Sequence, residues 1–345
     1  MSLLSDEIHS EPGALKRLLT NQVEQAAGIA AAIRARDVGH VVIAARGTSD
    51  NASRYAKYLF GALNGLSVGL ATPSLFSVYR TPPRFRNALV IGVSQSGQSP
   101  DIIAVVEEGR RQGSLTVAVT NALESPLADV AEYVLPVDAG PELAVAATKS
   151  YMNQLGALAL LAVQLAGKAE HLALLQAVPD AVERTLELDE QIRRIAQRYA
   201  YATEAVVLGR GYNYGTAFEI ALKLKELTYM VVEPYSSADF RHGPVAIVDR
   251  GFPAIVVAPQ GMIYPDMVEL TRDLANREAE LVVISGQDEV LNMASTALRL
   301  PVELPEWLSP FTCIVPGQLL AMHITRAKGY DVDYPRGLKK VTETR

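Results

Sequence analysis

Hydroxyl and amide side chains are concentrated at residues 94–101, where the sequence SQSGQSPD directly follows a short apolar stretch. Ser99 and Pro100 are typical of a helix start, with serine as the N-cap and proline as the first helical residue. Free backbone N–H groups and the helix dipole favour an anion at such a position. The segment therefore predicts an anion cradle, the alternative being a plain polar turn before a capped helix.

The same segment argues against a nucleotide site. The chain has no GxxxxGK[ST] motif, and the turns at residues 46–48 (RGT) and 209–211 (GRG) do not complete a dinucleotide fingerprint. A serine-rich turn without lysine or arginine suits a small phosphomonoester better than a triphosphate. The corresponding turn of the second half, PQGMI at residues 259–263, lacks the serines, so we expect the halves to differ in function.

Acid and base groups are found mainly in the second half. Glu219, Lys223 and Glu226 are spaced i, i+4, i+7 and share one face of a predicted helix, which could also be an ordinary exposed, ion-paired face. His242 lies in an irregular loop, SSADFRHGP, and is the best-placed proton shuttle. The remaining histidines fall in helix or strand patterns and are predicted to be structural: His9, His40, His171 and His323.

Composition limits the function classes. The 345 residues are 49% hydrophobic and carry a net charge of −6, which argues against a nucleic-acid partner bound through phosphate contacts. Cys313 is the only cysteine, so intrachain disulfides and cysteine-cluster zinc sites are excluded, and its apolar neighbours predict burial. The longest apolar run, residues 151–167, is too short and too polar for a membrane span. We expect a cytoplasmic protein with no membrane partner.

The positioning elements are short, continuous apolar runs separated by helical patterns, as in parallel strands covered on both faces. The pattern occurs twice, and two landmarks, Arg46 with Arg210 and Gln154 with Gln318, are each 164 residues apart. We therefore predict an α/β fold of two tandem doubly wound parallel-sheet domains, flavodoxin- or Rossmann-like and internally duplicated. The expected strands are residues 40–45, 88–93, 114–120 and 133–137, then 204–211, 253–258, 280–286 and 298–304.

The predicted domains follow from these runs. We expect a helical N-terminal segment at 1–34, a first domain with the phosphate cradle at 35–167, and a helical connector at 168–199. A second domain at 200–330 and a C-terminal tail at 331–345 complete the chain. The tail is polar and lacks periodicity, which by itself predicts disorder.

Six motifs occur together in the chain: RGTSDNA, SQSGQSPD, ELAVAATKSYMNQ, EIALKLKEL, DFRHGPVAIVD and DVDYPRGLKKVT. In combination they resemble the sugar isomerase (SIS) family, from about residue 25 to residue 345. Within that family the chain is similar to the isomerase half of glutamine–fructose-6-phosphate transaminases and to SIS-type glucosamine-6-phosphate deaminases.

The resemblance implies specific roles. Glu226 would move a proton between C1 and C2, and His242, lent by the neighbouring subunit, would open the sugar ring. Lys340 would form a Schiff base with the ketose, which turns the tail from predicted disorder into a predicted lid. The phosphate and the sugar hydroxyls would be held by five residues of the serine turns: Ser49, Ser94, Gln95, Ser96 and Ser99. Thr148 and Lys223 would be supporting residues.

The resemblance implies a glucosamine-6-phosphate deaminase/isomerase that needs no metal or organic cofactor and works as a homodimer with a shared active site. The chain starts MSLLS, so we expect it to lack a glutaminase domain and to release ammonia from glucosamine 6-phosphate rather than use glutamine. A deglycase or isomerase of another 6-phosphosugar is the alternative enzyme. A sugar-phosphate sensor is the alternative from another class, although it would not need Glu226, His242 and Lys340.

Overall fold

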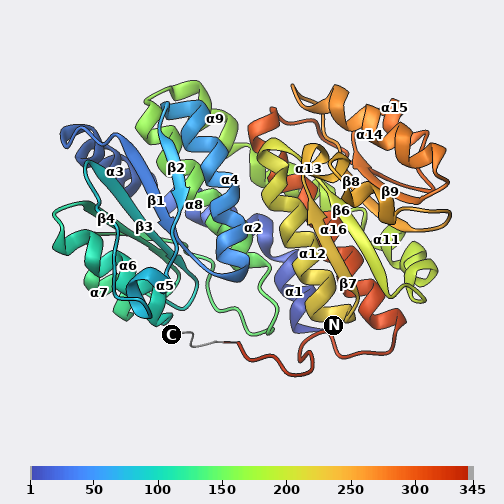
Figure 1. Ribbon diagram of the computed structural model, residues 1–345, viewed down its shortest axis with the longest axis horizontal. Coiled ribbons are helices and arrows are strands. Elements are labelled where there is room, and N and C mark those ends of the chain that lie inside the picture. Colours follow the sequence, from blue (N-terminus) through green and yellow to red (C-terminus); the bar gives the residue numbers. More distant parts are fainter. Residues whose placement is uncertain (1, 341–345) are drawn as a thin grey trace. The chain divides into compact units, whose positions relative to one another are not determined.

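The computed structural model describes residues 2–340 and divides into two compact units, each built on one sheet (Figure 1). The first-sheet unit comprises residues 11–142, 149–177 and 339–340 of the described part of the chain. The second-sheet unit comprises residues 2–10, 143–148 and 178–338. Each unit is therefore assembled from segments that lie far apart in the sequence.

The first sheet is parallel throughout, with the strand order β2-β1-β3-β4-β5. Its strands are β1 (His40–Ala44), β2 (Ser67–Leu70), β3 (Ala88–Ser94), β4 (Leu115–Thr120) and β5 (Tyr133–Pro136). The unit's helices are α2 (Glu11–Asn21), α3 (Val23–Ala35), α4 (Gly47–Asn64), α5 (Ser74–Ser77), α6 (Pro100–Arg111), α7 (Pro126–Val130), α8 (Lys149–Ala166) and α9 (Ala169–Gln176).

The central strands of this sheet are covered on both faces, and every residue of β3 and β4 is buried. Val90 of β3 packs with Ile102 and Val106 of α6 on one face. Its neighbours Leu89 and Ile91 are equally buried, and because side chains alternate along a strand they point to the opposite face. Helices α4 and α8, which contact β3 and β4 respectively, belong to that second layer.

The second sheet is also parallel, and its order β10-β9-β8-β6-β7, read from the other end, is equivalent to that of the first. Its strands are β6 (Glu204–Leu208), β7 (Val231–Tyr235), β8 (Pro253–Val257), β9 (Glu280–Ser285) and β10 (Thr296–Arg299). The unit's α-helices are α1 (Leu3–His9), α10 (Val178–Leu186), α11 (Asp189–Ala196), α12 (Tyr214–Thr228), α13 (Ser237–Arg241), α14 (Tyr264–Asn276), α15 (Asp288–Leu291) and α16 (Ser309–Ala327). Four 3-10 turns complete it: η1 (Gln197–Tyr199), η2 (Gly211–Asn213), η3 (Pro244–Ile247) and η4 (Glu306–Leu308).

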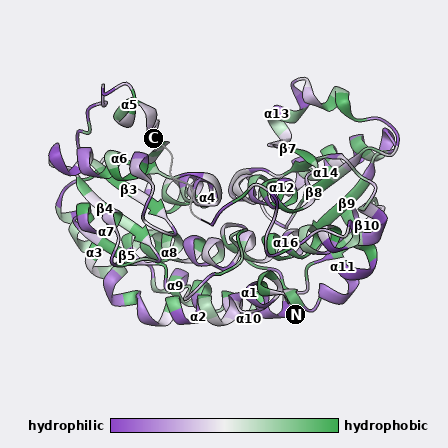
Figure 2. Ribbon diagram, turned by 90° about the horizontal axis from the view of Figure 1, so that it is seen from below, coloured by the Kyte–Doolittle hydropathy of each residue, from purple (hydrophilic) through white to green (hydrophobic). Residues whose placement is uncertain are grey.

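The core of the second-sheet unit repeats the same layering. Val206, Val256 and Val283 from three strands pack against Met267 and Leu270 of α14 on one face. Helices α12 and α16 pack against each other and contact the strands β6 and β9. Figure 2 accordingly shows the central strands of both sheets as mainly hydrophobic.

These observations confirm the predicted tandem doubly wound α/β fold. The last predicted strand, at residues 298–304, is displaced: β10 is Thr296–Arg299, and Pro301 beyond it has no N–H group for a ladder. The sequence analysis missed β2 and β7, each of which is one of the two edge strands of its sheet.

Three further expectations concern single features. Cys313 is fully buried, as predicted, and burial raises the pKa of its thiol well above the usual value. Among residues 2–340, no helix combines the length and apolar character that crossing a bilayer requires. Residues 331–340 of the predicted lid contain no helix or strand, and its last five residues lie outside the described part of the chain.

Candidate functional site

The serine run forms the turn between β3 and α6. Ser94 ends β3, and its Oγ accepts a hydrogen bond from the Gly97 N–H at 3.1 Å. The Ser96 Oγ accepts one from the Gln98 N–H at 3.3 Å. Ser99 is the N-cap of α6 with extended backbone, but its side chain makes no capping hydrogen bond to the helix. Two hydroxyls thus shape the turn, and the Ser99 hydroxyl is not used to cap the helix.

Gly97 and Gln95 fix this turn against its neighbours. Gly97 has a φ of 64°, and a Cβ added there would lie 2.1 Å from the Ser125 Oγ, so only glycine fits. The Gln95 carbonyl accepts a hydrogen bond from the Asn121 N–H, at the end of the next strand. The turn is therefore held closely at the carboxyl ends of β3 and β4, where doubly wound sheets bind ligands.

A cation also contacts the start of α6. The Nε and an Nη of Arg46 each lie 2.8 Å from the buried Oδ2 of Asp101. Arg46 precedes α4, so this ion pair links the turn after β1 to the turn after β3. The sequence analysis used Arg46 only as a landmark of the duplication and assigned no basic residue to the phosphate, whereas the structure places a half-exposed guanidinium beside the start of α6.

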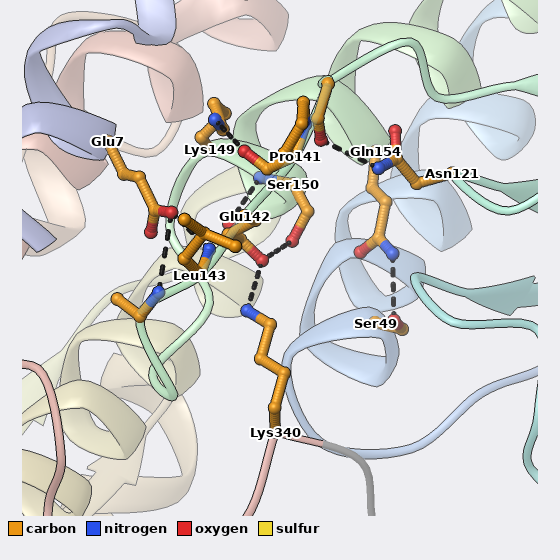
Figure 3. A network of polar contacts seen from close by, with 12 residues as sticks. Glu7, Ser49, Asn121, Pro141, Glu142, Leu143, Lys149, Ser150, Gln154 and Lys340 are labelled. Carbon is orange, nitrogen blue, oxygen red and sulfur yellow. Dashed lines mark hydrogen bonds and ion pairs between the residues drawn. The ribbon is translucent and has the colours of Figure 1, made fainter. Parts of the chain in front are cut away.

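Ser49, in the first turn of α4, is nearly buried. Its Oγ accepts a hydrogen bond of 2.9 Å from Nε2 of Gln154, a fully buried residue of α8 (Figure 3). The Gln154 amide therefore orients the Ser49 hydroxyl from helix α8. Ser49 lies in the helix that follows β1, and Ser94 ends the adjacent strand β3, so both belong to the carboxyl-end edge of the first sheet.

Lys340 brings the tail into the first-sheet unit. Its Nζ lies 2.7 Å from Oε2 of Glu142, whose side chain is completely buried (Figure 3). The Glu142 carboxylate also accepts hydrogen bonds from the backbone N–H and the Oγ of Ser150, at 2.9 and 2.8 Å. Three donors thus surround one carboxylate, and one of them is the predicted Schiff-base lysine.

The sequence analysis did not single out Glu142. It lies in the ELAVAATKSYMNQ segment, whose motif was noted for the family likeness without assigning the glutamate a role. A local signal did exist. A glutamate in an apolar segment just before a buried helix is expected to be buried, and a buried carboxylate needs a hydrogen-bond donor or a cation beside it. The identity of that partner, 198 positions further along the chain, could not be inferred from local sequence.

The acid and base groups of the second-sheet unit lie on α12. Lys223 is 1% exposed, and its Nζ lies 2.5 Å from Glu226 and 3.5 Å from the fully buried Glu219. This overturns the alternative of an exposed, ion-paired face, because α12 packs against α16. Burying such a charge cluster contributes little net stability. The Glu226 side chain is 23% accessible, so among these three charged residues it is the one that can contact a ligand.

His242 follows α13 as its C-cap residue and is exposed. The helix before it is tied to α14, because Asp266 accepts hydrogen bonds from Ser237 and Arg241. Burial opposes ionisation of Asp266, but the hydrogen bonds from Ser237, Arg241 and Arg210 outweigh it, so the pKa of Asp266 lies below its usual value. An anchored loop thus presents the imidazole at the surface of its unit.

The structure divides the predicted site residues between the two units. The serine turns and Lys340 belong to the first-sheet unit, whereas Lys223, Glu226 and His242 belong to the second. Thr148, predicted as a supporting residue, is buried immediately before α8. The roles of all these residues remain predictions.

The sequence matches the SIS domain family over residues 35–164 and 199–325, one match in each half. The chain belongs to the SIS family. This confirms the likeness inferred from the motifs. Both SIS segments contain one five-stranded parallel sheet of equivalent strand order.

Among its relatives, the SIS chain is 33% identical to glutamine–fructose-6-phosphate aminotransferase (isomerizing) of Aquifex aeolicus, over 97% of this chain and 56% of that protein. The chain thus spans little more than half the length of this relative. A structure from Silicibacter pomeroyi assigned as a phosphosugar isomerase is 34% identical, with a TM-score of 0.87 over 96% of this chain and 100% of that one. The C-terminal domain of glucosamine-fructose-6-phosphate aminotransferase from Francisella tularensis is 26% identical, with a TM-score of 0.86 over 97% and 98%.

Proposed function

We propose that the chain is a glucosamine-6-phosphate deaminase/isomerase, which converts glucosamine 6-phosphate and water into fructose 6-phosphate and ammonia. The observation that carries the proposal is the Lys340–Glu142 ion pair in the unit that contains the serine turn. A phosphate cradle alone would serve a sensor. An amine held by a buried carboxylate adds a group that can attack a carbonyl or imine carbon.

Binding begins at the serine turn. The hydroxyls of Ser96 and Ser99, with the amides at the start of α6, would receive the phosphate, since donors at a helix N-terminus stabilise an anion. Ser49, oriented by Gln154, would bind a sugar hydroxyl. Because the phosphate would meet mainly neutral donors, the net charge of −6 is no obstacle to an anionic substrate.

The reaction then needs one acid/base group to open the sugar ring and one base to move a proton from C2 to C1. His242 would protonate the ring oxygen and accept the C1 hydroxyl proton, which opens glucosamine 6-phosphate to its aldehyde. Glu226 would remove the C2 proton and return it to C1, while one proton of the amine passes to O1, so that C1 becomes a hydroxymethyl group and C2 an imine. Lys223, buried and 2.5 Å from Glu226, would hold that carboxylate in position for the transfer.

Ammonia leaves by exchange at C2. The neutral amine of Lys340 would add to the C2 imine and expel ammonia, which forms a new imine between C2 and Nζ. Water would then hydrolyse that imine, giving the C2 ketone of fructose 6-phosphate and returning the free lysine. Glu142 lies next to Nζ and can take up and return the lysine's proton in both steps.

The oligomer forms part of this proposal. His242 is exposed on the second-sheet unit, and we place it in the active site of a neighbouring copy, so that the enzyme works as a homodimer with shared sites. A second candidate, isomerisation of an unaminated 6-phosphosugar, is favoured by the similarity to the Silicibacter pomeroyi structure.

An ammonia-release assay over a small substrate panel tests the proposal. The purified chain is incubated with glucosamine 6-phosphate or glucose 6-phosphate, and with fructose 6-phosphate plus either ammonium or glutamine. We expect ammonia and fructose 6-phosphate in equal amounts from the first substrate. Conversion of glucose 6-phosphate alone would establish the second candidate, whereas binding without turnover across the panel would indicate a sensor.

A further inference from the structure

The second-sheet unit contains a counterpart of the serine turn. Residues 258–263 connect β8 to α14, at the same place in the strand order as the turn between β3 and α6. The first residues of the two helices, Pro100 and Tyr264, are 164 positions apart, which is the offset of the duplication. This turn has no serine, so its side chains cannot repeat the cradle.

A carboxylate of the same chain accepts hydrogen bonds from the backbone amides of this second turn. Oε2 of Glu306 accepts a hydrogen bond from the Met262 N–H at 2.7 Å, and its Oε1 accepts a longer one from the Ile263 N–H at 3.4 Å. Ile263 is the N-cap residue of the 13-residue helix α14 and makes no side-chain capping bond. The carboxylate therefore lies where the amides and dipole of a helix favour an anion.

The surroundings are fitted to this side chain. Gly261 has a φ of 155°, and a Cβ added there would lie 2.4 Å from a carboxyl carbon of Glu306. The Glu306 carbonyl accepts a hydrogen bond from the Ser309 Oγ, which Asn213 contacts in turn, so the backbone that carries the carboxylate is fixed.

Glu306 is also the duplicate of Glu142, since the two residues are 164 positions apart and each precedes the long closing helix of its half. Glu142 is engaged by Ser150 and Lys340, whereas its duplicate binds the turn after β8. The same ancestral position has thus acquired different partners in the two halves.

We infer that Glu306 is an internal substitute for phosphate, which fills a latent anion site in the second half and leaves each chain with one phosphosugar site. The comparison with the first half rests on the proposed phosphate role of the serine turn. The anion site itself does not, because its evidence is the contact between Glu306 and the two amides.

Chemical rescue tests this inference without any measurement of turnover. We expect Glu306→Ala to lower the thermal midpoint of the full chain, and inorganic phosphate to restore it. The rescue should be roughly 2–4 °C at a phosphate concentration about tenfold above the dissociation constant of the new site. All midpoints are measured in the Ser96→Ala/Ser99→Ala background, so that phosphate binding at the first turn is weakened.

Glu303→Ala is the matched control, because it removes a nearby exposed acid that contacts Gln287 rather than the turn. A phosphate effect in Glu306→Ala no larger than in Glu303→Ala would overturn the inference. If Glu306→Ala does not yield folded protein, Glu306→Ser replaces it, since its short polar side chain leaves the amides of Met262 and Ile263 vacant. Phosphate must then stabilise that variant more than the control, and equal stabilisation would equally refute the latent site.

Discussion

Lys340 and Glu142 are separated by 198 positions in the chain, yet the lysine Nζ lies 2.7 Å from the glutamate Oε2. The carboxylate is completely buried, while 26% of the lysine side chain is accessible. Glu142 therefore lies in the interior of the first-sheet unit, and Lys340 contacts it from the tail. This arrangement gives the tail a specific docking point within the first-sheet unit.

We expect Glu142→Gln to reduce kcat by about 100-fold, because a lysine that loses its anchoring charge is poorly placed for attack. The KM for glucosamine 6-phosphate should change little, since the serine turn is untouched. Borohydride reduction in the presence of fructose 6-phosphate should label Lys340 in the unmodified chain and label it much less in this variant.

Glu132→Gln is the control for that prediction, because Glu132 is a carboxylate of the same unit that binds Arg36 at the surface. Its kcat and its labelling should match those of the unmodified chain. Labelling of a Lys340→Ala chain to the same extent would show that another lysine forms the adduct and would remove the proposed role of Glu142.

Glu226→Gln should lower turnover by about 10²–10⁴-fold while substrate binding survives, because the amide cannot accept the C2 proton. Hydrogen exchange at C2 of the bound sugar in deuterated water measures the step directly and should be lost together with turnover. The exposed Glu233 on β7 provides the matched variant, Glu233→Gln, which should exchange normally. Persistent exchange in Glu226→Gln would assign the proton transfer to a different base.

The fold was predictable because its signals are local. Continuous apolar runs marked the buried strands, and the repeated Arg-Gly turns indicated the duplication. The edge strand Ser67–Leu70 escaped notice because its residues are at most half-buried and include Gly69, and Val231–Tyr235 because it contains Pro234. The opposite edge strands, β5 and β10, were predicted because apolar runs mark them, so an edge position alone does not hide a strand.

The candidate site was predictable only in part, for a related reason. The serine turn is contiguous, so its chemistry is visible in the sequence. The spacing of Glu219, Lys223 and Glu226 shows that they share a helix face, but only the packing of α12 on α16 decides that the face is buried. Glu142 and Glu306 act through contacts with distant segments, which no local pattern specifies.

The pH dependence of stability should reflect His323. Burial lowers its pKa, an effect that the hydrogen bond to Asp189 only partly offsets, and the positive charges of Arg326 and Arg193 add to the lowering. His9, on α1, contacts the same aspartate at 3.2 Å. Below its usual pKa of about 6.5, the unfolded chain binds a proton at His323 that the folded chain resists. The free energy of unfolding should therefore fall as the pH drops through about 6.5.

His323→Gln should flatten this part of the profile, because glutamine can still donate to Asp189 but does not titrate. Urea unfolding between about pH 5.5 and pH 7.5 gives the measurement. His242→Gln is the matched control, since it removes an exposed imidazole from the same unit and should retain the slope. Identical profiles for His323→Gln and the unmodified chain would contradict the expected contribution of the buried histidine.

Mixing experiments test the shared active site. His242→Ala and Lys340→Ala chains should each be inactive as homodimers, because each lacks one proposed step at both sites. If His242 acts in the neighbouring copy, a mixed dimer contains one site with both residues intact and one site with neither. Co-refolded mixtures should therefore regain about one quarter of the unmodified activity, since half of the dimers are then mixed and each has one working site of two. If His242 acts within its own chain, every site of a mixed dimer lacks one residue, so a verified mixed dimer without activity would contradict the lent histidine.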